Sequence, residues 1–240
     1  VHLTLRAGEI TAIAGVSGNG QGALADVLCG VRMPVQGQVM LRGQPLPAHP
    51  QRLVAQGVAR IPEDRHAVGV VGDLPVWENA VSERLGSRWF SHPWFTAGWI
   101  KRGRARQHAR RVAETFDVRG GGPDVPARSL SGGNMQKLIL GRALMPPDPA
   151  SPDTPRLIVA HQPAWGLDVG AVRFVQQQLI DARDAGAAVL LISADLDEIL
   201  ALSDVIVVMF DGRITARLTP AEATPELLGT YMTGGEQEVA

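Results

Sequence analysis

A glycine-rich segment near the start of the chain constrains the fold and the chemistry more than any other feature. It follows a short apolar run, residues 10–14, and precedes apolar residues at helical spacing, Ala23, Leu24, Val27 and Leu28. This order predicts a buried strand, a glycine loop and a helix. Backbone N–H groups in such a loop and at the helix N-terminus can bind phosphate, although the same turn can also serve only close packing. The candidate phosphate-binding residues are Gly15, Val16, Ser17, Gly18, Asn19, Gly20, Gln21 and Gly22.

The loop resembles a P-loop in its spacing but differs from it at two side chains. The P-loop pattern is Gly-x4-Gly-Lys-Ser/Thr, and here Gln21 stands at the lysine and Gly22 at the hydroxyl residue. A charge-assisted hydrogen bond contributes about 1.5–3 kcal/mol, against about 0.5–1.5 kcal/mol for a neutral one. Because the lysine cation and the hydroxyl ligand for Mg²⁺ are both missing, we expect the loop to bind nucleotide weakly.

The second half of the chain alternates apolar runs with helical patterns. Apolar runs predict buried strands at residues 157–160, 188–192 and 205–210. Helical periodicity predicts helices at residues 134–145, 172–185 and 195–202. Alternation of this kind is typical of a parallel α/β sheet. Strand signals fade between residues 76 and 118, and residues 104–116 predict a basic amphipathic helix, so we expect a helical subdomain there.

Composition and charge exclude several classes of protein. The 240 residues are 45% hydrophobic and 20% charged, which excludes a disordered chain, and the net charge of -1 gives no bulk attraction to nucleic acid or an anionic membrane. We therefore interpret the basic run at residues 101–111 as a solvated helix face. No apolar run approaches the ~18 residues that span a bilayer. The single Cys29 predicts a buried thiol in a reducing compartment, and the start at Val1 predicts a piece of a longer protein.

A second glycine turn changes the interpretation of the first. At the turn Leu130, Ser131, Gly132, Gly133 and Asn134, the sequence resembles the nucleotide-binding domain of ATP-binding cassette (ABC) transporters. The signature of that family is a Leu-Ser-Gly-Gly turn at a helix N-terminus. The Ser131 side chain and the free N–H groups that follow it form a second expected anion site. The alternative is a plain N-cap turn without a ligand.

Three residues depart from the family at positions that act in hydrolysis. The family's second nucleotide motif is an apolar strand that ends in an aspartate for Mg²⁺ and a glutamate base. Here these positions hold His161 and Gln162. The switch segment, residues 191–195, has Ala194 in place of the family's histidine. The resemblance therefore implies that the chain's own catalytic site is degenerate.

Two further motifs complete the resemblance. The Q-loop, residues 61–65, carries Glu63 in place of glutamine, and the D-loop is matched by Gly166, Leu167 and Asp168. The family's first strand and its adenine-stacking aromatic residue are expected before Val1. The resemblance implies an α/β fold: a P-loop NTPase core with a mainly parallel sheet, an N-terminal antiparallel β portion and an inserted α-helical subdomain. The implied divisions are a first part of the ATP-binding core at residues 1–75, the helical subdomain at 76–128, and the signature helix with the rest of the core at 129–240.

The particular residues of these motifs are similar to those of one branch of the family. It resembles the C-terminal, degenerate cassette of the two-cassette ATPase subunit of simple-sugar and nucleoside importers. That resemblance implies ATP as ligand, Mg²⁺ at a partner's site, and a second cassette packed head to tail in the same parent chain. It also implies transmembrane permease subunits, a position on the cytoplasmic face of the membrane, and no nucleic acid. Trp165 and the proline-rich loop at residues 145–156 depart from the usual pattern of this branch.

The substitutions fall at the chain's own nucleotide site, whereas the intact motifs are those that act on a partner's nucleotide in the family. Phosphoryl transfer depends on a lysine, Mg²⁺ and a water-orienting residue, and the chain lacks all three at its own site. Gln162 is not basic, and Ala194 cannot hydrogen-bond to a γ-phosphate. The signature and the D-loop, which act on a partner cassette in the family, are intact. We expect a weakly active or inactive domain that completes the site of a partner; the alternatives are a soluble ABC ATPase outside transport, and a scaffold that binds no nucleotide.

A cluster of aromatic residues lies in the predicted helical subdomain. We expect it to be partly core and partly an exposed patch against a permease. Its members are Trp89, Phe90, Trp94, Phe95 and Trp99.

Overall fold

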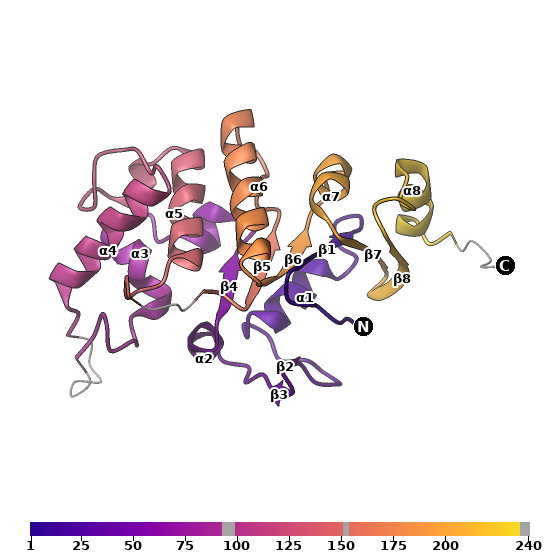
Figure 1. The fold of residues 1–240 in the computed structure, drawn as a ribbon, viewed down its shortest axis with the longest axis horizontal. Coiled ribbons are helices and arrows are strands. Elements are labelled where there is room, and N and C mark those ends of the chain that lie inside the picture. The colour runs from indigo at the N-terminus through magenta and orange to yellow at the C-terminus, as the bar shows by residue number, and fades with distance from the viewer. Residues whose placement is uncertain (93–98, 151–153, 236–240) are drawn as a thin grey trace.

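A six-stranded sheet runs through the computed structural model of the chain, which describes residues 1–92, 99–150 and 154–235 (Figure 1). The strand order is β4-β5-β6-β1-β7-β8; the first five strands are parallel, and β8 pairs antiparallel with β7. The strands are β1 (Glu9–Ala14), β4 (Val58–Ile61), β5 (Leu157–His161), β6 (Ala188–Ile192), β7 (Val205–Phe210) and β8 (Arg213–Leu218). The predicted mainly parallel α/β sheet is confirmed.

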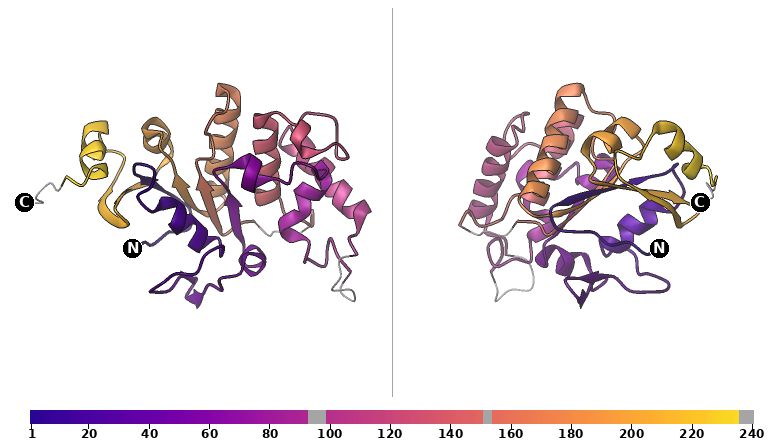
Figure 2. Two further views of the ribbon diagram at one scale, coloured as in Figure 1. Left: turned by 180° about the vertical axis from the view of Figure 1, so that it is seen from behind. Right: turned by 45° about the vertical axis from the view of Figure 1, so that its right-hand side comes forward.

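Helices cover both faces of this sheet, as Figures 1 and 2 show. Successive residues of a strand point to opposite faces, so β1 contributes to two cores. Ile10 and Ala12 belong to the core on one face, and Ile13 belongs to a second core on the other face. The helices are α1 (Gln21–Leu28), α2 (Pro50–Ala55), α3 (Val76–Val81), α4 (Arg102–Thr115), α5 (Gly132–Leu144), α6 (Val169–Asp184), α7 (Leu196–Leu202) and α8 (Pro225–Met232).

The helices α3, α4 and α5 gather at one end of the sheet (Figure 1). On α4, Ala105, Ala109 and Val112 are buried. Of the basic residues at 101–111, Arg102, Arg104 and Arg110 are exposed, and Lys101, Arg106 and Arg111 are half-buried. Arg104 lies over the Trp89 ring at 4.5 Å from its centroid, so part of the basic face covers aromatic surface. The predicted amphipathic helix is confirmed, and its basic face is partly solvated and partly packed on aromatic rings.

The aromatic cluster in this region is mixed, as predicted for those members that the structure describes. Phe90 is fully buried, Trp89 is half-buried, and the Trp99 side chain is 70% exposed. Trp94 and Phe95 lie outside the described residues. A mixture of core and surface therefore holds for three of the five residues.

Short antiparallel segments flank the parallel core. Near the N-terminus, β2 (Met40–Leu41) and β3 (Gln44–Pro45) form a two-stranded hairpin separate from the main sheet.

Cys29 is buried, as predicted, and burial raises the pKa of its thiol to about 12. Among the described residues there is no helix with the length and apolar character needed to cross a bilayer.

Candidate nucleotide-binding site

Four of the predicted motifs gather at one edge of the sheet. The five parallel strands end in the same direction, and α/β proteins bind ligands outside these carboxyl ends. The glycine loop follows β1, Glu63 follows β4, His161 ends β5, and Ser193 follows β6. The sheet topology therefore brings together segments that are far apart in the sequence.

The glycine loop holds Gln21 inside it. Gln21 is buried, and its side-chain amide nitrogen Nε2 donates to the backbone oxygen of Val16 over 3.1 Å. A Cβ atom at Gly15 would lie 2.3 Å from this Nε2 and 2.6 Å from the Met209 backbone oxygen, so only glycine fits there. The residue in the lysine position thus lies against the loop backbone and offers a neutral amide.

The tip of the loop is open and is anchored on one side. Ser17 and Gly18 are exposed, and a Cβ atom at Gly18 would meet no atom within 4 Å. Asn19 fixes the loop to the β7–β8 turn, because its side-chain oxygen accepts from the Asp211 N–H at 3.0 Å and its backbone oxygen accepts from Gly212 at 3.0 Å. The loop leads into α1, so its N–H groups suit a phosphate.

The residues at the positions that bind Mg²⁺ in the family do not suit that ion here. Gly22 offers no side-chain oxygen, and its Cβ position would lie 3.7 Å from Cε1 of His161. His161 Nε2 lies 3.5 Å from a Glu63 carboxylate oxygen. Burial lowers the pKa of His161, and Glu63 opposes that effect. Mg²⁺ prefers oxygen ligands, and the described residues contain no cluster of three or more His, Cys, Asp or Glu side chains that could hold a metal. The site therefore does not fit the ion.

The residue in the position of the glutamate base has another partner. Gln162 has a φ of 48°, which is uncommon for a residue other than glycine, and its backbone N–H donates to Ile192 at 2.7 Å. Its side-chain oxygen accepts from the Ala194 N–H at 3.3 Å. Gln162 therefore ties β5 to the switch segment and is no base for an attacking water.

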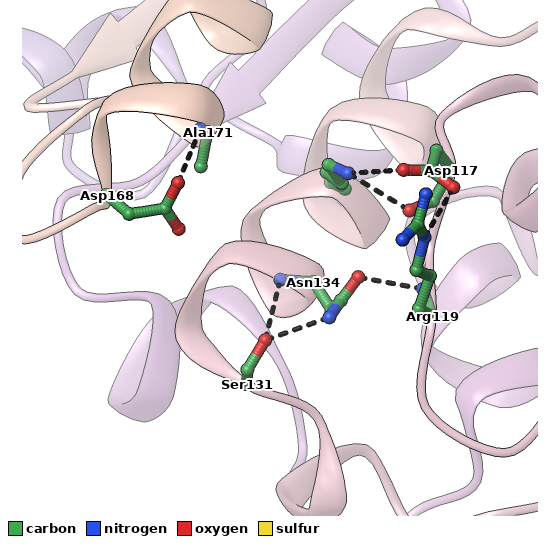
Figure 3. A network of polar contacts seen from close by, with 7 residues as sticks. Asp117, Arg119, Ser131, Asn134, Asp168 and Ala171 are labelled. Atoms are coloured by element: carbon green, nitrogen blue, oxygen red, sulfur yellow. Dashed lines mark hydrogen bonds and ion pairs between the residues drawn. The ribbon is translucent and has the colours of Figure 1, made fainter.

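The signature turn forms the N-terminus of α5, next to the start of α6 (Figure 3). Ser131 is the N-cap of α5, and Asp168 of the D-loop is the N-cap of α6, where it accepts from the Ala171 N–H at 3.0 Å. A Cβ atom at Gly133 would lie 3.5 Å from the Ala171 Cβ, so the two helix ends pack closely. The structure thus places the signature and the D-loop side by side on the surface.

Arg65 connects these two motifs to the Q-loop, a role that the sequence did not reveal. Its guanidinium donates to the Trp165 backbone oxygen at 2.7 Å and to the Gly166 backbone oxygen at 3.4 Å. A Cβ atom at Gly132 would lie 3.5 Å from the Arg65 Nε atom. The acceptors are backbone carbonyls, so no side-chain pattern in the sequence signals the contact.

We expect Arg65→Ala to lower the free energy of unfolding by about 1 kcal/mol, because it removes charge-assisted hydrogen bonds that are partly open to solvent. Urea denaturation of the purified chain measures this loss. Arg110→Ala, at an exposed position on α4, is the matched control and should change stability by less than about 0.5 kcal/mol. Equal effects of the two substitutions would show that Arg65 does not hold the D-loop in place.

Known proteins resemble this chain in sequence and in fold. Residues 1–149 match the family model described as ABC transporter. The chain is 41% identical to the guanosine import ATP-binding protein NupO of Bacillus subtilis, over 100% of the chain and 45% of that protein. It is 43% identical to the glucose import ATP-binding protein TsgD13 of Haloferax volcanii, over 100% of the chain and 42% of that protein. The chain thus spans less than half the length of these relatives.

Solved structures agree with the fold. A nucleotide-free ATP-binding cassette from an ABC transporter superimposes with a TM-score of 0.75 at 24% identity, covering 95% of this chain and 90% of that one. A dimeric cassette in a post-hydrolysis state, bound to ADP and Pi, superimposes with a TM-score of 0.71 at 19% identity, covering 92% of this chain and 89% of that one.

Proposed function

This chain belongs to the ABC transporter family as an ATP-binding domain, and from that premise we propose that it is the degenerate cassette of an importer for simple sugars or nucleosides. One observation carries the proposal. The nucleotide site of the chain lacks the family's cation, metal ligands and base, while the signature turn is complete and its Ser131 is exposed. A cassette of this kind binds nucleotide weakly itself and completes the site of a partner cassette.

The names of the relatives support the substrate class. The two relatives described above import guanosine and glucose, and both match this chain over its whole length. Because the chain covers less than half of each relative, we propose that a second cassette lies in the same parent chain. That cassette would supply the lysine, the Mg²⁺ ligands and the catalytic base.

The geometry of the signature supports action on the partner's nucleotide. Ser131 is exposed at the start of α5, and no hydrogen bond or ion pair joins it to the chain's own glycine loop within the described residues. Asp168 stands beside it at the start of α6. In a head-to-tail pair, these residues close over ATP held by the facing cassette. Its binding then favours the closed pair, and hydrolysis favours reopening.

The proposed importer also requires a membrane partner. We assign residues 76–128 to a helical subdomain that contacts transmembrane permease subunits on the cytoplasmic face, and residues 1–75 and 129–240 to the ATP-binding core with the signature helix. Closure of the two cassettes would thereby move the permease.

Substitution of Gln21 tests whether the glycine loop faces a nucleotide. Gln21→Lys should tighten ATP binding about tenfold, because a charged hydrogen bond exceeds a neutral one by about 1.4 kcal/mol. Calorimetric titration without Mg²⁺ measures the affinity, and hydrolysis should remain low because base and metal ligands are still missing. Gln177→Lys, on the exposed face of α6, is the matched control.

Other results would favour the alternatives. An affinity for ATP that Gln21→Lys leaves unchanged would show that Gln21 does not approach the phosphates. Failure of both the unsubstituted chain and Gln21→Lys to bind ATP would favour a scaffold that binds no nucleotide. Copurification of the parent protein without any membrane subunit would favour a soluble ABC ATPase outside transport.

A further inference from the structure

One backbone donor fixes the direction of the hydrogen bonds in the signature turn (Figure 3). The N–H of Arg119 lies 2.7 Å from one end of the Asn134 side-chain amide. A backbone N–H can only donate, so the atom that it meets is the amide oxygen, Oδ1. The other end, Nδ2, therefore faces the Ser131 hydroxyl and donates to Oγ over 2.8 Å.

This arrangement determines where the Ser131 proton points. A hydroxyl oxygen has two lone pairs and one proton. Asn134 occupies both lone pairs, through its Nδ2 at 2.8 Å and its own backbone N–H at 3.4 Å. The proton must then be directed away from Asn134. Since the Ser131 side chain is exposed and has no acceptor for this proton among the described residues, the O–H group points outward from the N-terminus of α5.

The segment that carries Arg119 is itself tied to α5. Asp117 adopts a φ of 50°, and its carboxylate accepts from Arg119 Nε and from Lys137 Nζ, each at 2.9 Å. Lys137 also donates to the Asp117 backbone oxygen at 3.1 Å. These donors hold the pKa of the Asp117 carboxyl below its usual range, so it stays charged. Because Lys137 lies one helical turn beyond Asn134, the Arg119 N–H is held at a fixed distance from the signature turn.

We propose that Asn134 is a positioning residue, whose amide holds the Ser131 hydroxyl so that its proton is directed at a phosphate oxygen of nucleotide in the facing cassette. The inference rests on the proposed action of the signature turn on a partner's nucleotide. A donor that is already oriented needs no rearrangement when charge develops on the phosphate, and this is the condition under which hydrogen bonds accelerate a reaction most.

A carboxylate in place of the amide would reverse the arrangement. In Asn134→Asp, one oxygen can still accept from the Arg119 N–H. The other oxygen cannot donate to Ser131 and would instead accept the hydroxyl proton. Asparagine and aspartate have nearly the same size, so the turn should keep its shape. The substitution therefore withdraws the proton from the nucleotide while leaving the hydroxyl in place.

A double-mutant cycle in the assembled transporter tests this inference, with kcat for ATP hydrolysis and KM for ATP as readouts. Ser131→Ala should lower kcat about 10²–10³-fold, and Asn134→Asp should lower it by a similar factor. The Ser131→Ala/Asn134→Asp double variant should match Ser131→Ala within about twofold, because no hydroxyl is left to orient. KM should change less than kcat. Asn134→Ala, which adds no charge, should show a smaller loss that also disappears in the Ser131→Ala background.

Two results would overturn the inference while leaving the proposed function intact. One is a wild-type kcat in Asn134→Asp. The other is a double variant that loses the full product of the two single factors, as direct repulsion between a new carboxylate and the phosphate would produce. Should Asn134→Asp fail to fold in thermal unfolding, the same cycle with Asn134→Ala decides. A wild-type kcat in Ser131→Ala would instead reject the action of the signature on a partner, and the inference with it.

Discussion

The isolated chain is expected to release phosphate from ATP at or near the background rate. Loss of a general base alone typically costs about 10²–10⁴ in rate. Here Gln162 stands in the position of that base, its amide is not basic, and its side-chain oxygen accepts from the Ala194 N–H. Gly22 and His161 provide no oxygen ligand for Mg²⁺. Since these losses affect separate parts of phosphoryl transfer, any one of them would slow turnover.

Steady-state phosphate release from the purified chain measures this expectation. The Gln162→Ala variant is the control, because a residue that activates no water should leave the rate unchanged. Turnover of about 1 s⁻¹ or more, in the ordinary range of enzymes, that falls in Gln162→Ala would show that the site is catalytically competent.

The central part of the fold could be predicted because each buried strand is a continuous apolar run. Residues 157–160, 188–192 and 205–210 were predicted as strands, and they form β5, β6 and β7 within one residue. The two edge strands, β4 and β8, were not predicted, because neither is a continuous apolar run. In β4 the run is interrupted by Arg60, and β8 alternates exposed and half-buried residues, since each lies at an edge of the sheet.

The motifs of the candidate site could be located from the sequence, but their contacts could not. The spacing of glycines identified the loop around Gly15, where a Cβ atom would lie 2.6 Å from the Met209 backbone oxygen, and resemblance to the family's Leu-Ser-Gly-Gly turn identified the signature. The hydrogen bonds from Arg65 to Trp165 and to Gly166 of the D-loop span 100 and 101 residues and end on backbone oxygens. The contact of Arg119 with Asn134 likewise uses a backbone N–H. Such contacts have no side-chain signature, so only the structure reveals them.

The second large effect is expected at Ser131 in the assembled transporter. Ser131→Ala removes an exposed hydroxyl that the account places on the phosphate of the facing cassette, where one lost donor costs about 10²–10³ in rate. Gly132→Leu should be similarly damaging, because a bulky side chain would meet Arg65 and cover the N–H groups of the turn. Gly132→Leu also disturbs Arg65 of the chain's own Q-loop, whereas Ser131→Ala touches neither Arg65 nor the glycine loop. A loss of activity in Ser131→Ala would therefore report on the partner's site.

Kinetic comparison of Ser131→Ala with Gln162→Ala in the assembled transporter tests whether this cassette acts on its partner's nucleotide and hydrolyses none at its own site. Both variants are first shown to be folded and assembled, and kcat for ATP hydrolysis is then measured at saturating ATP. We expect a loss of about 10²–10³-fold for Ser131→Ala and a change within about threefold for Gln162→Ala, since Gln162 activates no water. Equal losses in the two variants would contradict this expectation, because this cassette would then hydrolyse ATP at its own site.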